Sequence, residues 1–150
     1  MTAKKVLVPI DAREHSEEIV PVVAALAHDT GGTVRLLRVF PVPEQVIGSH
    51  GQTVSYVDQE MARLTAQGTD DLRRAEAQLG RVPVESVVRF GDPAEEILLE
   101  AEAFDADHIA LVTSAEGGLG RVLAPGVAER VARKAPVPAL VLRVPGARRH

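Results

Sequence analysis

The sequence predicts an α/β fold in which a parallel sheet carries helices on both of its faces. Short, nearly continuous apolar runs alternate along the chain with segments whose apolar residues recur every three or four positions. These two patterns are typical of buried strands and amphipathic helices, and strands that alternate with helices pair in parallel through right-handed crossovers. The length of 150 residues, of which 45% are hydrophobic and 25% charged, fits a single domain over residues 1–150.

The first part of the chain predicts a strand, a helix and a second strand. Residues 6–10 are a short apolar run rich in β-branched side chains, which indicates a strand buried on both faces. Ser16 is the expected N-cap of the first helix, and Gly31 with Gly32 is expected to end it. The apolar run over residues 34–40 predicts the second strand.

The middle of the chain predicts a long loop, a long helix and an edge strand. Residues 44–56 show no clean period, so we expect a long loop there. A third strand is expected over residues 82–90, near a sheet edge because of Pro83. Between them, steps of three and four predict an amphipathic helix that Gly80 ends, with an apolar face made of Met61, Leu64, Gly68, Leu72, Ala75 and Leu79.

The last part of the chain predicts two helices and two strands. Asp92 can cap a helix that begins at Pro93, a residue whose fixed φ suits the first helical position. The remaining expected elements are a strand within 107–112, a short helix over roughly 126–134, a strand over 139–142 and a frayed tail over about 145–150.

Composition and charge exclude several classes of function. The net charge of −4 argues against a nucleic-acid partner, which would require clustered Lys and Arg. The absence of cysteine excludes disulfides, thiol nucleophiles, iron–sulfur clusters and Cys-based zinc sites. The first apolar run stops at Pro9 and Asp11, too short for a signal-peptide core, and no run approaches a membrane span. We therefore expect a cytoplasmic protein without a membrane partner.

Neither a catalytic residue nor a metal site is predicted. Ser114 follows a strand but lacks the Gly-x-Ser-x-Gly pattern of a nucleophile elbow. The histidines do not have the helical spacing of metal ligands; they are His15, His28, His50, His108 and His150.

The turns after the first and fourth strands indicate a ligand crevice. Asp11 follows the first strand, and the small, Gly-rich segment 114–120 follows the fourth. In an open parallel sheet such turns meet at the carboxyl edge, where the strand order reverses and ligands usually bind.

Several segments together resemble the universal stress protein, or UspA-like, family over nearly the whole chain. They are Val6-Leu7-Val8-Pro9-Ile10-Asp11, Glu14-His15-Ser16-Glu17, Gly91-Asp92-Pro93-Ala94-Glu95-Glu96-Ile97-Leu98, and Val127-Ala128-Glu129-Arg130-Val131 followed by Ala135-Pro136-Val137-Pro138-Ala139-Leu140-Val141. The resemblance implies a flavodoxin-like, adenine nucleotide alpha hydrolase-like sheet of five strands in the order 3-2-1-4-5. It also implies a homodimer joined through the last strand.

Some members of that family bind ATP through a Gly-x2-Gly-x9-Gly-(Ser/Thr) loop after the fourth strand, and others lack the loop and do not bind it. In one register the motif positions hold Val112, Ala115, Pro125 and Gly126. One residue later they hold Thr113, Glu116, Gly126 and Val127, so at most one motif residue is kept. Gly117, Gly118 and Gly120 still keep the loop open, and Arg121 could supply a positive charge for phosphate.

The adenine side of the pattern is kept better than the phosphate side. Pro9, Asp11 and Val39 match positions that line the base and ribose in ATP-binding relatives. The Asp11 carboxylate could accept a hydrogen bond from the exocyclic amine or a ribose hydroxyl. It could equally cap local backbone, and Val39 could be a core residue.

These residues form the predicted nucleotide site: Pro9, Asp11, Val39, Ala115, Gly117, Gly118, Arg121, Gly126 and Val127. The resemblance predicts a homodimeric stress-response module that binds ATP or another adenine nucleotide. Mg²⁺ is expected only together with the nucleotide. The alternative is a nucleotide-free dimeric scaffold with a degenerate phosphate loop. A third hypothesis is slow ATP hydrolysis, with Asp11 and Arg121 around the phosphates.

Overall fold

Five parallel strands form one sheet in the order β3-β2-β1-β4-β5, as predicted. The computed structural model describes residues 4–10, 13–43, 52–114 and 126–144. Its strands are β1 (Lys5–Pro9), β2 (Thr33–Phe40), β3 (Val84–Phe90), β4 (His108–Ser114) and β5 (Ala139–Val144). The edge position predicted for the third strand is therefore confirmed, and Pro83, which has no N–H to pair, stands just before it.

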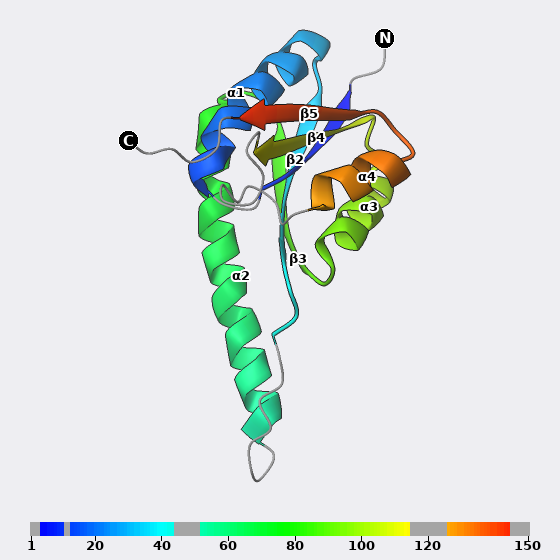
Figure 1. The fold of residues 1–150 in the computed structure, drawn as a ribbon. Coiled ribbons are helices and arrows are strands. Elements are labelled where there is room, and N and C mark those ends of the chain that lie inside the picture. The colour runs from blue at the N-terminus through cyan, green and yellow to red at the C-terminus, as the bar shows by residue number, and fades with distance from the viewer. Residues whose placement is uncertain (1–3, 11–12, 44–51, 115–125, 145–150) are drawn as a thin grey trace, which may run out of the picture.

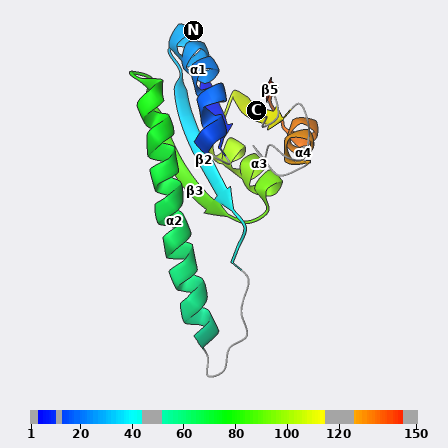
Figure 2. The same ribbon diagram turned by 60° about the vertical axis from the view of Figure 1, so that its left-hand side comes forward.

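Helices cover both faces of the sheet (Figures 1 and 2). They are α1 (Arg13–Thr30), α2 (Gln52–Leu79), α3 (Pro93–Phe104) and α4 (Val127–Lys134). The helices α1 and α2 lie on one face, and α3 and α4 lie on the other.

The core is divided into two clusters because successive strand residues point to opposite faces. Val34 and Leu36 of β2 pack with Val20 and Val23 of α1. Leu37, the residue after Leu36, points to the opposite face and packs in the second cluster together with residues of α3 and α4. The sheet is thus buried on both sides, as near-continuous apolar strands require.

The ends of α1 differ in how well the sequence predicts them. This helix begins at Arg13, three positions before Ser16, so Ser16 is inside the helix and the predicted N-cap is wrong. A capping residue type is a weak signal when helix-forming residues such as Arg13 and Glu14 precede it. The predicted C-terminus is confirmed, because Gly31 follows with a φ of +68°, a left-handed conformation that favours glycine.

The largest difference from prediction is the start of α2. The structure begins this 28-residue helix at Gln52, inside the stretch 44–56 that was expected to be a loop; residues 44–51 lie outside the described chain. The first turns of α2 project beyond the sheet (Figure 2). A helix that has no core to face there does not show the apolar period by which amphipathic helices are recognised.

The start of α3 is as predicted. The Asp92 carboxylate accepts a hydrogen bond from the backbone N–H of Glu95 at 3.0 Å, and Pro93 occupies the first turn. The short helix and the last strand are also confirmed, with β5 reaching Val144, two residues further than expected. The tail over 145–150 lies outside the described residues.

Candidate functional site

The carboxyl ends of β1 and β4 mark the point where strand order reverses. The two strands are neighbours in the middle of the sheet, with Val6 opposite His108 and Leu7 opposite Ile109. The next strand in sequence after β1 lies on one side of this pair, and β5 lies on the other. Ligands in open α/β sheets bind in the crevice outside such a switch point.

The end of β1 leads directly to the predicted base-binding position. Pro9 is buried, and Ile10 is 4% exposed. The backbone N–H of Ile10 donates to the carbonyl of Leu37 at 2.7 Å, which continues the β1–β2 ladder beyond the strand. Asp11 is the next residue and lies outside the described part of the chain. The residue before it, Ile10, is hydrogen-bonded to β2.

Val39 lies near the end of β2 and belongs to the core. It is half-buried and packs against the cluster that contains Leu37 and residues of α3 and α4. Packing therefore accounts for an apolar residue at this position whether or not a ligand is bound.

Gly126 and Val127 form the start of α4. Gly126 has a φ of +83°, is exposed, and provides no side-chain cap, while the N–H of Arg130 donates to its carbonyl at 3.0 Å. The backbone N–H groups of residues 127–129 therefore have no acceptor within the helix. The Val127 side chain is 4% exposed and lies in the core, so its backbone N–H is the group available to a ligand.

The other predicted site residues cannot be placed in this geometry. Asp11, Ala115, Gly117, Gly118 and Arg121 all lie outside the residues that the structure describes. The described part of the site is thus the end of β1, the end of β2 and the first turn of α4.

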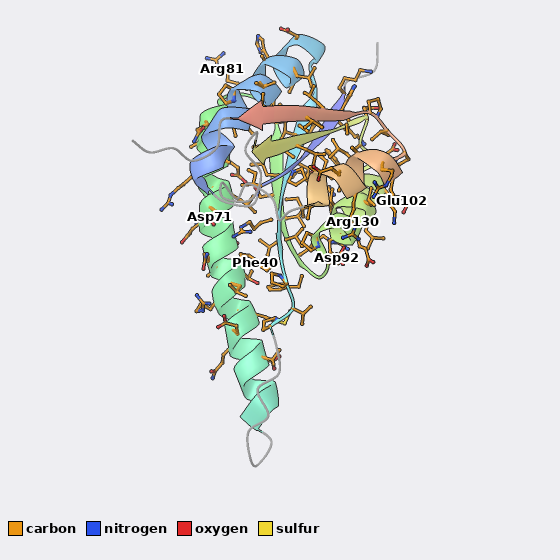
Figure 3. All side chains as sticks on the ribbon, viewed as in Figure 1. Phe40, Asp71, Arg81, Asp92, Glu102 and Arg130 are labelled. Carbon is orange, nitrogen blue, oxygen red and sulfur yellow. The ribbon has the colours of Figure 1, made fainter. Side chains whose placement is uncertain are left out.

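The sequence did not indicate the ion pair between Arg130 of α4 and Asp92. Arg130 Nη2 donates to the Asp92 Oδ2 atom at 3.2 Å, which joins the first turn of α4 to the cap of α3 (Figure 3). The N–H of Glu95 and, less strongly, Arg130 hold the pKa of Asp92 below its usual value. The positive charge on α4 nearest Gly126 is therefore already partnered by a carboxylate.

A partly buried cluster of ions, centred on Glu100, lies between β2, β3 and α3. Glu100 is 3% exposed; its Oε2 atom accepts from Arg35 at 2.5 Å and its Oε1 atom from Arg89 at 2.8 Å. Arg35 also binds Glu85, and Arg89 also binds Glu96. We call these five residues the Glu100 cluster.

The Glu100 cluster has a structural role and does not form a catalytic site. Hydrogen bonds to Glu96 and Glu100 raise the pKa of Arg89. Burial alone would lower the pKa of Arg35, but its bonds to Glu85 and Glu100 outweigh burial and raise it. Both carboxylate oxygens of Glu100 are occupied by arginines, so the geometry matches a satisfied buried ion network and not an exposed acid or base.

The described residues contain neither a metal-binding cluster nor a membrane-spanning helix. No group of three or more His, Asp or Glu side chains in that part of the chain could hold a metal ion. Within the same residues, no helix combines the length and the apolar character needed to cross a membrane.

Comparison with known proteins agrees with the fold. The pattern of the Universal stress protein family (Usp) matches residues 2–143. A universal stress protein of Methanocaldococcus jannaschii is 29% identical over 144 residues, which cover 95% of this chain and 83% of the relative.

Two solved structures have the same fold. The universal stress protein UspA from Lactobacillus plantarum superposes with a TM-score of 0.76 at 16% identity, covering 95% of this chain and 99% of that one. A universal stress protein from Archaeoglobus fulgidus in complex with dAMP superposes with a TM-score of 0.63 at 17% identity, covering 94% and 98%.

Proposed function

Because this chain belongs to the universal stress protein family, we propose that it is a regulatory module of the stress response that binds an adenine nucleotide where the carboxyl ends of β1 and β4 meet. The dAMP complex of the Archaeoglobus fulgidus relative supports this class of ligand on the same fold. ATP is the first nucleotide to test, with Mg²⁺ as its companion.

The observation that carries this proposal is the backbone at Gly126. Its φ of +83° is one that side-chain-bearing residues rarely adopt, and no side chain caps α4. A glycine immediately before a helix, whose first N–H groups have no acceptor within the helix itself, is a favourable place for a phosphate. This geometry supports the second motif register, in which Gly126 is the third glycine of the loop.

The base-binding half of the proposal rests on β1. The hydrogen bond from Ile10 to Leu37 holds the chain up to the residue before Asp11. An aspartate carried at the carboxyl edge beside β4 can accept from the adenine amine or a ribose hydroxyl. We propose that Asp11 supplies this contact and that the first-turn N–H groups of α4 supply the phosphate contact.

The nucleotide-free scaffold remains the second candidate, for a specific reason. Val127 stands at the hydroxyl position of that register and its side chain is buried in the core. The nearby Arg130 is paired with Asp92. A phosphate would therefore bind through backbone N–H groups, with fewer partners than the full motif offers.

We further propose that the protein is a homodimer joined through β5. Leu140 and Val141 of this edge strand are 39% and 42% exposed. These consecutive residues point to opposite faces of the sheet, so both faces of the edge are apolar. Pairing with a second β5 would cover them and satisfy the free strand edge. The cytoplasmic location stays a prediction.

Thermal unfolding with ATP and Mg²⁺ tests the nucleotide proposal. A ligand present at about one hundred times its Kd stabilises the folded state by about 2.7 kcal/mol. We expect a higher Tm with ATP and not with GTP, and no shift for Asp11→Ala. Asp29→Ala, at an exposed position on α1, serves as the control.

A second pair of variants tests the phosphate half. Gly126→Ala should reduce the shift caused by ATP. Gly80→Ala places alanine at a similar positive φ, +67°, with open space around it, and controls for backbone strain alone. If the folded dimer shows no shift with any adenine nucleotide, the scaffold is the correct function. Phosphate release that is lost in Asp11→Asn would instead identify the ATPase.

A further inference from the structure

A cleft of about 490 Å³ lies at the amino-terminal ends of β2 and β3, at the opposite end of the strands from the proposed nucleotide site. It opens between the carboxyl-terminal ends of α1 and α2, where the chain enters β2 and β3. A volume of this size lies within the range of small-molecule pockets, about 300 to 1,000 Å³. Its position separates it from the switch point at which nucleotides are expected.

The walls of the cleft are mainly apolar. Ala24 and Ala27 come from α1, Leu79 from the end of α2, and Val82 and Pro83 from the segment before β3. The small side chains from α1 leave the space open. An apolar molecule in the cleft would therefore remove hydrocarbon from water on both sides, which is the main source of affinity in such pockets.

Part of the backbone at the mouth of the cleft is paired by hydrogen bonds. The N–H of Gly32 donates to Ala27 at 2.7 Å, and the N–H of Gly31 donates to the carbonyl of His28 at 3.3 Å. At the end of α2, the N–H of Val82 donates to Leu79 at 3.3 Å. These bonds use the carbonyls of Ala27, His28 and Leu79, three of the acceptors at the ends of the two helices.

Two side chains at the cleft can bind a negative charge. His28 from α1 and Arg81 from the α2–β3 connection both line it and are exposed; Figure 3 shows Arg81 beside α1. Neither has an ion-pair partner within the described chain, unlike Arg35, Arg89 and Arg130, which bind carboxylates. A guanidinium always carries its charge, and an imidazole has an N–H to donate in either protonation state.

We propose that this cleft is a second ligand site, for a small straight-chain carboxylate whose acyl chain lies against the apolar walls and whose carboxylate binds Arg81 and His28. The ligand is expected to combine an apolar chain with one negative charge. This matches the apolar walls of the cleft and the donors of Arg81 and His28, which have no ion-pair partner among the described residues. The proposal does not depend on nucleotide binding.

Isothermal titration of the 150-residue protein tests the chemistry of the ligand, with hexanoate, octanoate and decanoate below their micelle concentrations. Each added methylene should tighten the Kd about fourfold, the equivalent of ~0.8 kcal/mol per buried CH₂. Decylamine, which has the same chain and the opposite charge, should bind at least tenfold more weakly than decanoate. Equal binding of the amine would overturn the proposal, and so would a Kd independent of chain length.

Two pairs of variants test the location. Arg81→Glu should weaken decanoate at least tenfold, while Arg133→Glu, a matched exposed arginine on α4, should leave its Kd unchanged. Ala25→Phe fills the cleft from its exposed side and should abolish binding; Ala66→Phe, on an exposed face of α2, should not. Equal effects within each pair would contradict the site. The Tm shift with ATP should be the same in all four variants, so the two proposals fail independently.

Discussion

The two edge strands of the sheet, β3 and β5, have opposite surroundings. At the β3 edge, α2 packs closely on one face, and the Glu100 cluster binds the other face to α3. At the β5 edge, Leu140 and Val141 remain 39% and 42% exposed. Charged side chains on an edge strand discourage pairing with another chain, whereas apolar ones on both faces favour it.

This difference bears on which edge of the sheet could pair with a second copy. Glu85, the outermost residue of the Glu100 cluster, is 54% exposed and presents its carboxylate beside β3. On the other face, Gly68 brings α2 so near that an added Cβ would stand 2.9 Å from the Phe40 ring. The β3 edge thus carries a charge and is packed under a helix, which agrees with the proposal that β5 is the edge that pairs with a second copy.

The largest effect is expected from removing the centre of the Glu100 cluster. Glu100→Ala leaves Arg35 and Arg89 facing each other without their shared carboxylate, which should lower the free energy of unfolding by about 3 to 5 kcal/mol. Glu85→Ala removes a half-exposed partner and should cost less than about 1 kcal/mol. Urea unfolding measures both, and equal stability of the two variants would contradict the structural role of the cluster.

The next effect concerns the β5 edge. Leu140→Lys places a charge in the proposed dimer interface and should raise the dimer Kd about thirtyfold, the equivalent of about 2 kcal/mol. Leu99→Lys, on an α3 residue that is 50% exposed, is the matched control and should not change it. Sedimentation across a dilution series gives the Kd, and a Leu140→Lys dimer as tight as the wild type would rule out β5 as the interface.

A smaller effect should come from separating α2 from the β3 edge. Gly68→Leu forces a side chain into the space held by Phe40 and Val88, and overpacking of this kind should cost about 1 to 2 kcal/mol. Ala66→Leu, at an exposed position of the same helix, controls for a leucine that does not meet Phe40. If Phe40 is the obstacle, adding Phe40→Leu to Gly68→Leu should cost less than the sum of the single changes.

The smallest effect is expected at the exposed pair that joins α3 to α4. The pKa of Asp92 is lowered in the folded protein by the N–H of Glu95 and by Arg130. The ionised Asp92 carboxylate therefore stabilises the fold fully above the pKa that aspartate has in the unfolded chain. This stabilisation is lost as the pH falls through the lower pKa of Asp92 in the folded protein. The Tm advantage of wild type over Asp92→Asn should shrink as the pH is lowered below about 4, near the ordinary aspartate pKa.

The asparagine variant is informative because asparagine still caps a helix but carries no charge. Arg130→Gln removes the partner and should raise the pKa of Asp92 as followed by NMR titration. An unchanged Asp92 pKa in that variant would show that the cap hydrogen bond alone sets it.

The sheet was predictable because its signals are local. Buried strands read as apolar runs, and Asp92 with Pro93 forms a start signal that the structure confirms. The beginning of α2 could not be found in this way, because the helix leaves the sheet there and no apolar period accompanies it. The strand order came from the family resemblance, since alternation of strands and helices alone does not determine which strand lies beside β1.

The candidate site was partly predictable. Gly126 stood out by its residue type, and its positive φ agrees with that choice. Val127 was selected from the motif spacing, which does not say that its side chain turns into the core. The Glu100 cluster joins residues 65 and 11 positions apart, as in Arg35–Glu100 and Arg89–Glu100. Contacts over such separations depend on the assembled sheet and leave no periodic mark in the sequence.

The projection of α2 gives this one helix two different stabilities. Its second half, with Leu72, Ala75 and Leu79, is buried against the sheet. The turns before Gly68 depend more on their own hydrogen bonds and on side-chain pairs such as Glu60 with Arg63, and isolated helices of this length are marginal in water. The exchange rate of the amide hydrogens should therefore increase along α2 from Leu79 back to Gln52. The helix should unwind from its amino-terminal end while the domain stays folded.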